Sequence, residues 1–273
     1  MFGWRARLGV VVPSSNTTVE GEFRRALPDG VSLHAARMPL ESVTVAELDS
    51  MADDAVACAE RLAHANVDVV AYACTTGSLL HGSGFDGDLE RSLSETAEVP
   101  AVATALSVKR ALRALDAERI AVVTPYTDEL NDREESYLND AGFDVVELDG
   151  RGIEANIGIG TLRPEDTYRQ VRKVVSELEL NSDSSSRSES SSKSDSEPTS
   201  NSKSESAGDS KPLADSVDAV FVSCTNYRTF PSIEALEADL GIPVVTSNQA
   251  TLWDALRRPG VAGGAPGRLG TID

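Results

Sequence analysis

The feature that constrains this chain most is a duplication, because one order of apolar and helical segments occurs twice within 273 residues. The first apolar run, residues 7–13, ends in proline and is matched by residues 119–125, which end in the same way. Short, nearly continuous apolar runs are typical of parallel strands that are buried on both faces. The duplication therefore predicts two similar units, each built around such strands.

The other strands of each copy follow in the same order. They are predicted at residues 31–37, 67–73 and 100–104 in the first copy, and at 145–148, 217–223 and 242–246 in the second. Strands that alternate with helical segments are typical of a parallel sheet with helices on both faces. We therefore predict an α/β fold of two similar lobes, each a short parallel sheet flanked by helices, related by a pseudo-twofold axis. The first lobe is expected over residues 1–108 and the second over 109–258.

Two segments do not fit this repeat. Residues 181–210 are dominated by serine with acidic residues and a little lysine. Such a composition cannot bury enough apolar surface to offset the entropy of ordering, so it predicts a disordered acidic insertion in the second lobe. Residues 259–273 are rich in glycine and proline and are predicted to form a flexible tail.

The chain is strongly acidic, with 44 Asp and Glu against 25 Lys and Arg and a formal net charge of −19. Such a surface repels nucleic acid and anionic lipid, so neither is expected as a partner. No apolar run is long enough to span a membrane, and the first strand begins too early to leave room for a signal peptide, so we expect a cytoplasmic protein. The acidity fits either an acidic disordered segment or a high-salt cytoplasm. We favour the halophilic interpretation because residues 181–210 also contain basic side chains. A homo-oligomer remains open.

The three cysteines differ in their surroundings. They do not form a disulfide framework, and without a CxxC pair or a Cys/His cluster no metal site is predicted. Cys58 lies on an apolar helix face, where a packing role is expected. Cys74 and Cys224 each end the third strand of a copy and begin a polar turn. Backbone N–H groups and a helix dipole at such a turn would favour thiolate.

Further polar residues follow strand ends, where the binding crevice of a parallel sheet lies. Asn16 and Tyr126 each follow the first strand of a copy. Asn16 is equally explained as a helix cap, and Tyr126 as a half-buried phenol. Asn156 lies in a loop after the second strand of the second copy, where a turn role is the default. His81 follows the Cys74 loop and is a weaker candidate.

Four segments carry a resemblance to a known family: residues 12–20 (VPSSNTTVE), 73–78 (ACTTGS), 124–126 (TPY) and 223–229 (SCTNYRT). They resemble the aspartate/glutamate racemase superfamily and, within it, the maleate cis-trans isomerase branch, which includes relatives of arylmalonate decarboxylase. The resemblance covers the chain apart from the serine-rich insertion and the tail.

The resemblance implies two α/β lobes with the active site between them and chemistry without metal or organic cofactor. It implies that Cys74 is the nucleophile and Cys224 its acid or base partner. The residues that would hold a small carboxylate substrate are Asn16, Thr75, Tyr126, Asn156 and Thr225. Three functions remain open: a maleate-type isomerase, a racemase or decarboxylase acting on another small carboxylate, and a non-catalytic carboxylate-binding protein. Thr75 and Thr225 would contribute their N–H groups, and Arg228 has no assigned place.

Overall fold

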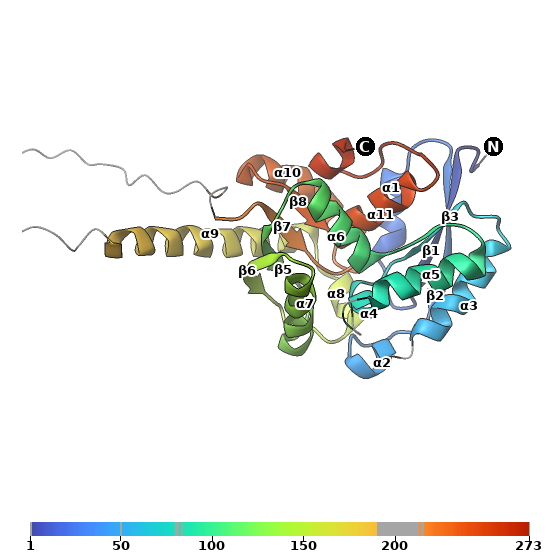
Figure 1. Cartoon of the computed structure of the whole chain (residues 1–273), viewed down its shortest axis with the longest axis horizontal. Helices are drawn as coiled ribbons and strands as arrows, with labels where there is room; N and C mark the ends of the chain where they lie inside the picture. The colour runs from blue at the N-terminus through green and yellow to red at the C-terminus, as the bar shows by residue number, and fades with distance from the viewer. Residues whose placement is uncertain are drawn as a thin grey trace, which may run out of the picture.

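The computed structural model describes residues 2–49, 51–79, 82, 84–189, 213 and 216–272. It contains two four-stranded sheets, ordered β2-β1-β3-β4 and β6-β5-β7-β8, and every pairing in them is parallel. Each sheet comes from one copy of the repeat, and the two lie at opposite sides of the molecule (Figure 1). The predicted α/β fold of two similar lobes is confirmed.

The elements of the first copy are β1 (Ala6–Pro13), α1 (Val19–Ala26), β2 (Val31–Met38), α2 (Val45–Asp49), α3 (Met51–Ala63), β3 (Val69–Tyr72), α4 (Thr75–Leu79), α5 (Phe85–Ala97), β4 (Ala101–Ala103) and α6 (Thr104–Ala114). Those of the second copy are β5 (Arg119–Val123), α7 (Asp128–Asp140), β6 (Asp144–Asp149), α8 (Asn156–Gly160), α9 (Pro164–Glu189), β7 (Ala219–Val222), α10 (Phe230–Leu240), β8 (Val244–Thr246) and α11 (Ser247–Arg257). A short 3₁₀ helix, η2 (Arg268–Thr271), follows. Among the described residues, no helix combines the length and apolar composition that a membrane crossing needs.

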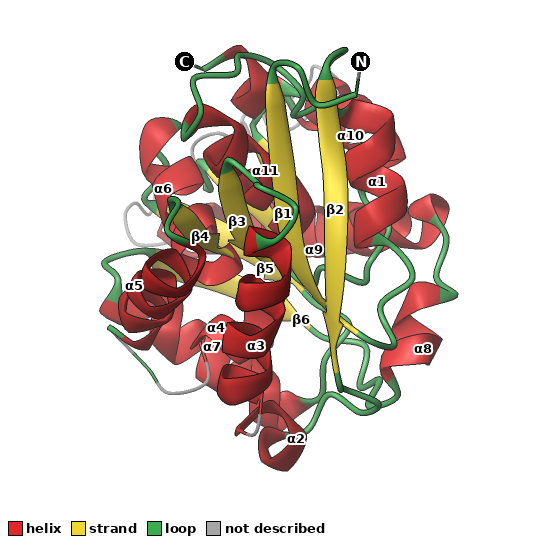
Figure 2. Cartoon of the chain, turned by 90° about the vertical axis from the view of Figure 1, so that its right-hand side faces the viewer, coloured by secondary structure: helices red, strands yellow, loops and turns green. Residues whose placement is uncertain are grey.

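The first sheet is buried on both faces. In β1, Val10 and Val12 pack in a cluster with α1 and α11, while Val11 packs in a cluster with α3 and α5. Successive residues of a strand point to opposite faces, so an uninterrupted apolar run is what a strand covered on both sides requires. Figure 2 shows β1 beside β2, the two longest strands of this sheet.

The second sheet follows the same rule. Ile120 and Val122 of β5 pack in a cluster with α6 and α7, whereas Ala121 and Val123 pack in a cluster with α9 and α10. The helix α6 belongs by sequence to the first copy, yet it covers the second sheet. The helix α11 ends the second copy and covers the first sheet. The two lobes therefore exchange a helix, and each sheet is completed by the other half of the chain.

The exchanged helix α6 spans the predicted boundary between the lobes. The boundary expected between residues 108 and 109 falls inside α6, because periodicity identifies a helix but not the sheet that it covers. Contacts between the exchanged helices include two short hydrogen bonds: Thr104 Oγ1 lies 2.9 Å from Thr251 Oγ1, and Ser107 Oγ donates to Asp254 Oδ2 at 2.9 Å.

Two further expectations differ from the structure. The predicted disordered insertion was expected to begin at residue 181, but α9 continues to Glu189; the rest of the insertion, residues 190–210, lies outside the described residues. The tail predicted as flexible is packed in its described part, since Leu269 is fully buried and Trp253 Nε1 donates to the Ile272 carbonyl at 3.1 Å. The few apolar residues of this tail pack against the rest of the protein, although the segment is rich in glycine.

Candidate active site

The two predicted cysteines line one cavity at the carboxyl ends of the two sheets. Cys74 follows β3 and Cys224 follows β7, and both are buried, with 3% and 5% of their surface exposed. The other residues that line this cavity are Pro13, Leu40, Val43, Thr75, Thr76, Tyr126, Asn156 and Thr225. The cavity is small, about 10 Å³, which is room for a single water molecule. An organic ligand needs more room than this, so we expect the cavity to enlarge when one binds.

The Cys74 turn opens directly into α4. The Cys74 sulfur lies 3.8 Å from Thr76 Oγ1 and accepts a hydrogen bond from the Gly77 N–H. A Cβ atom at Gly77 would lie 2.5 Å from the Tyr72 hydroxyl and 3.1 Å from the Cys74 sulfur. Glycine is therefore required for the helix to begin so close to the thiol.

The Cys224 turn has a different backbone. Cys224 has a φ of +91°, in the left-handed region that residues with a Cβ rarely adopt. This conformation places the Asn226 N–H 3.4 Å from the Cys224 sulfur and lets the Cys224 N–H donate to Ser247 Oγ at 3.1 Å. The Tyr126 hydroxyl lies close enough to this sulfur to lower its pKa. Strained conformations persist where the surroundings fix them, and they cluster at functional sites.

Both thiols are held in their neutral form. Burial raises the pKa of Cys74, and the hydrogen bonds from Gly77 and Thr76 offset this only in part. Burial also raises the pKa of Cys224, to about 12, against the opposing effect of Tyr126 and Asn226. The expectation that the turns favour thiolate is therefore not met in this closed state. Sequence patterns indicate the N–H groups at a strand end but not the extent of desolvation.

Three polar side chains next to the cysteines link the two halves of the chain through hydrogen bonds: Thr75, Thr225 and Asn16. Thr75 Oγ1 donates to Ser247 Oγ at 2.9 Å, and Thr225 Oγ1 donates to the Ala73 carbonyl at 3.1 Å. Asn16 does not line the cavity itself, but its Nδ2 donates to Thr225 Oγ1 at 3.2 Å. Its Oδ1 accepts the N–H groups of Thr18 and Val19 just before and at the start of α1, although the N-cap residue itself is Thr18, so Asn16 supports the helix start and also lies beside the site.

Asn156 closes the other side of the cavity at the start of α8. Its Nδ2 donates to Ser15 Oγ at 2.8 Å, and its carbonyl accepts from Asn226 Nδ2 at 2.7 Å. The loop before α8 also pairs with the loop before α2 through an isolated antiparallel bridge between Ser42 and Ala155. This bridge lies beside Leu40 and Val43, which form part of the cavity wall.

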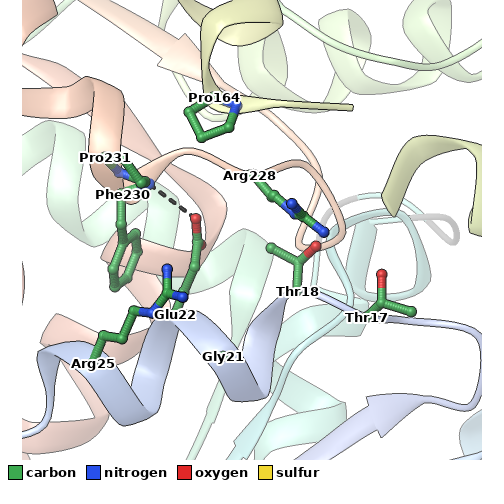
Figure 3. Close-up of a pocket in the computed structure, with 9 residues that line it drawn as sticks. All are labelled: Thr17, Thr18, Gly21, Glu22, Arg25, Pro164, Arg228, Phe230 and Pro231. Atoms are coloured by element: carbon green, nitrogen blue, oxygen red, sulfur yellow. Dashed lines mark hydrogen bonds between the residues drawn. The ribbon is translucent and has the colours of Figure 1, made fainter. Parts of the chain in front are cut away.

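Two other residues singled out in the sequence lie elsewhere. Arg228 lines a separate, half-enclosed cavity of about 250 Å³, together with Thr18, Glu22 and Arg25 (Figure 3). It does not line the cavity of the cysteines. His81 lies outside the described residues.

A model of one protein family matches most of this chain. The model is described as arylmalonate decarboxylase and matches residues 8–183 and 201–270, a span that includes both cysteine turns. The chain belongs to the arylmalonate decarboxylase family. This family stands within the branch that the sequence motifs indicated, and the predicted recognition is confirmed.

Members of the arylmalonate decarboxylase family with curated functions align over nearly the full chain. The chain is 28% identical to a maleate isomerase of Pseudomonas putida, covering 92% of this chain and 90% of that protein. It is 27% identical to an arylmalonate decarboxylase of Bordetella bronchiseptica, covering 96% and 93%. A similar solved structure is a cysteine mutant of the Nocardia farcinica maleate cis-trans isomerase with a covalently bound succinylcysteine intermediate. It aligns with a TM-score of 0.79 and 26% identity over 98% of this chain and 99% of that chain.

Sequence reasoning missed three residues that contact the site. Ser247 bridges Thr75 and the Cys224 N–H, and it follows β8 as the first residue of α11. Asn226 was within a quoted motif but was given no role. Glu134 is buried in α7 at 1% exposure and accepts a hydrogen bond from Ser223 Oγ at 2.6 Å. Its spacing of four residues from Leu130 and Leu138 places it on an apolar helix face, which is a signal that could have identified it.

Proposed function

We propose that this protein is a cofactor-independent isomerase that converts a small cis dicarboxylate of the maleate type to its trans isomer. The observation that carries this proposal is that Cys74 and Cys224, one from each half of the chain, line the same cavity. A soft thiolate is suited to conjugate addition to an activated double bond. The second thiol supplies a proton donor and acceptor at the same site.

The proposed reaction requires that Cys74 first lose its proton to solvent, and it begins with addition of the resulting Cys74 thiolate to one carbon of the double bond. The proton of the Cys224 thiol goes to the other carbon, which gives a succinyl thioether on Cys74 and a thiolate on Cys224. Rotation about the former double bond follows. The Cys224 thiolate then takes the proton back, the carbon–sulfur bond breaks, and the trans product leaves the Cys74 thiolate in place. No net proton or electron is exchanged.

Negative charge develops on the substrate carboxylate during the addition, and fixed hydrogen-bond donors stabilise such charge. We assign this role to Asn16, Thr75, Tyr126, Asn156 and Thr225. Supporting this assignment, all but Asn16 line the cavity, and Asn16 contacts Thr225. Thr75 is the first residue of α4, so its N–H has no acceptor within that helix.

The presence of two thiols favours isomerisation over decarboxylation. The resemblance of the sequence indicates that decarboxylase relatives work with a single cysteine, whereas this chain has one at each strand end. The succinylcysteine in the Nocardia farcinica isomerase is the adduct that the proposed route requires. A racemase would use the same two thiols on opposite faces of one carbon, so it is the remaining alternative for this cavity.

The test is to incubate the full-length protein with maleate in molar salt and to follow the products by proton NMR. We expect fumarate from the wild type and at least a hundredfold loss of rate with Cys74→Ala or Cys224→Ala. Cys58→Ala is the matched control, because Cys58 packs within α3 away from the cavity, and it should keep wild-type rates. Loss of carbon dioxide from an arylmalonate, with maleate unchanged, would instead establish the decarboxylase alternative.

We propose in addition a cytoplasmic location, adaptation to high salt and a reaction without metal or organic cofactor. The net charge of −19 supports the second of these, since salt screens the repulsion between surface carboxylates. Activity should therefore increase from dilute buffer to molar salt and should persist after treatment with EDTA. Light scattering will decide between a monomer and a homo-oligomer.

A further inference from the structure

Glu134 is a buried carboxyl group that the proposed reaction does not yet use. It projects from α7 and is 1% exposed. One oxygen, Oε1, accepts the hydroxyl of Ser223 at 2.6 Å, while Oε2 has no hydrogen-bond partner within the described residues. The neighbours around it are largely apolar and include Leu79, Ala105, Val108, Leu138 and Phe221. A buried carboxylate with an unpartnered oxygen is costly, so the surroundings favour the neutral acid.

Two hydroxyl groups lie between Glu134 and the second thiol. Ser223 directly precedes Cys224, and its hydroxyl contacts Glu134 at 2.6 Å. The Tyr126 hydroxyl lies close enough to Ser223 and to the Cys224 sulfur for each to influence its pKa, and Tyr126 and Cys224 line the same cavity. These four side chains come from α7, the end of β5 and the end of β7, and all are buried.

We propose that Glu134 is the proton reservoir of Cys224 and acts on it through the hydroxyls of Ser223 and Tyr126. For this transfer the proton of neutral Glu134 lies on Oε1, in the 2.6 Å contact with Ser223, and the Ser223 hydroxyl turns from Oε1 to the Tyr126 oxygen. When Cys224 gives its proton to the substrate carbon, the Glu134 proton moves across this contact to Ser223 Oγ. The Ser223 proton moves to the Tyr126 oxygen, and the Tyr126 proton moves to the Cys224 sulfur. The thiolate becomes a thiol and Glu134 becomes a carboxylate. The reverse transfers precede elimination, so atoms and charge balance over the cycle. This inference rests on the proposed isomerase function.

The ionisation of Glu134 suits such a role. Burial raises its pKa to about 7, and the hydrogen bond from Ser223 opposes this only in part. An acid with a pKa near the working pH exchanges protons most effectively. The titratable and charged groups around it are Tyr126, Cys224 and Tyr137, with Asp86 and Glu90 of α5 and Lys109 of α6 beyond Tyr137.

The reservoir predicts a pH dependence that can be isolated from the ionisation of Cys74. The measurement is kcat for maleate from pH 5.5 to about 9.5 in the wild type and in Glu134→Gln, which keeps the shape and an acceptor for Ser223 but cannot ionise. The ratio of the two rates cancels any effect of Cys74. We expect a ratio of about 100 or more below pH 7, the size of a proton-transfer contribution. Above about pH 7 it should fall as Glu134 ionises.

Glu135→Gln is the matched control on the same helix, because Glu135 is partly exposed and its neighbour Glu134 is not. Its rate ratio to the wild type should stay near 1 at every pH. Ser223→Ala removes one of the two hydroxyls between Glu134 and Cys224 while leaving Glu134 intact, and it should lose the same pH-dependent advantage as Glu134→Gln. A wild-type to Glu134→Gln ratio that is flat across the pH range overturns the reservoir, since a purely structural role would lower the rate equally at all pH values.

A second readout does not need isomerase activity. The infrared band of a protonated carboxyl group should disappear from wild-type spectra as the pH passes about 7, and Glu134→Gln should lack this change. Above pH 7, alkylation of Cys224 should be faster in Glu134→Gln, because the carboxylate raises the pKa of the thiol. If maleate is not converted but both signals appear, the proposed function fails and the coupling of Glu134 to Cys224 stands. If both signals are absent, the reservoir is wrong whatever the substrate.

Discussion

The backbone of Cys224 offers a test of how this site is held, because the two cysteines occupy equivalent strand ends with different conformations. Among the described residues, four that are not glycine have a positive φ: Asn66, Glu98, Asp116 and Cys224. Cys74 is not one of them. The perturbation is to replace each cysteine in turn by alanine and by glycine and to compare the four stabilities.

The expected magnitude follows from what the two sites share. At both, glycine removes one buried methyl group relative to alanine, worth about 0.8 kcal/mol, and gains backbone entropy in the unfolded state, worth about 0.5–1 kcal/mol. These contributions make Cys74→Gly less stable than Cys74→Ala. The same two contributions apply at Cys224. There, however, the alanine variant must also adopt a left-handed backbone conformation, which costs about 1–2 kcal/mol, whereas the glycine variant adopts it without this cost. The glycine-minus-alanine difference in unfolding free energy should therefore be about 1–2 kcal/mol more favourable at Cys224 than at Cys74.

The assay is urea or thermal unfolding of the four variants at one salt concentration. For a chain of this size the double difference corresponds to about 2–8 °C in Tm. All four variants lack a thiol that the reaction needs, so changes in stability are read without interference from activity. Equal glycine-minus-alanine differences at both positions would refute a strained turn at Cys224.

Other perturbations test the thiols, the cavity wall and the helix exchange. Burial raises the pKa of Cys224 to about 12, so alkylation of this thiol by iodoacetamide should accelerate about tenfold per pH unit from pH 7 to beyond pH 9. Mass spectrometry can follow the reaction. A plateau of the rate near pH 8 would instead show an activated thiolate. The bridge partners Ser42 and Ala155 form an antiparallel pair that is not hydrogen-bonded, with Cα atoms about 4.5 Å apart, so Ser42→Cys with Ala155→Cys should form a disulfide. Oxidation should abolish turnover and reduction should restore it, whereas oxidised wild type should stay active. Lys109→Met removes the ammonium group that lies 2.6 Å from the buried Asp86 carboxylate, and it should lower the unfolding free energy by about 3 kcal/mol. The double variant with Asp86→Asn has no unpaired charge and should regain most of this loss. Urea unfolding of both variants measures the two values.

The positions of the strands along the chain and the duplication could be predicted from the sequence because each strand is a short apolar run ended by a turn. Residues 31–37 were expected as a strand and form β2 at Val31–Met38, and residues 119–125 contain β5 at Arg119–Val123. The assignment of helices to sheets could not be predicted. An amphipathic helix such as α6 shows that it has an apolar face, but both sheets offer it an equally apolar surface.

The site was predictable where chemistry and topology coincide. Cys74 and Cys224 are rare nucleophiles at the same point of each repeat, so their convergence followed from the fold. The raised pKa values did not, because desolvation depends on which distant segments cover the turn. Glu134 could be found from the sequence as an acidic residue on an apolar helix face. Its contact with Ser223 could not be predicted, because Ser223 follows β7, which lies far along the chain.

The exchange of helices limits how a ligand can reach the thiols. Separating the two lobes would break the buried hydrogen bonds of Thr75 with Ser247 and of Thr225 with the Ala73 carbonyl, and it would pull α6 and α11 from the sheets that they complete. The edge of the cavity is held by fewer contacts between the two halves of the chain, and Leu40 there is bound to Ser14 and Ser15 of its own half. There, the loop before α2 joins the loop before α8 through two backbone hydrogen bonds, Val43 N–H to Glu154 at 2.9 Å and Asn156 N–H to Glu41 at 3.3 Å. Because the cavity is smaller than any dicarboxylate, we expect the loop at residues 41–43 to move when the substrate enters, and a disulfide across it should then stop turnover without altering either thiol.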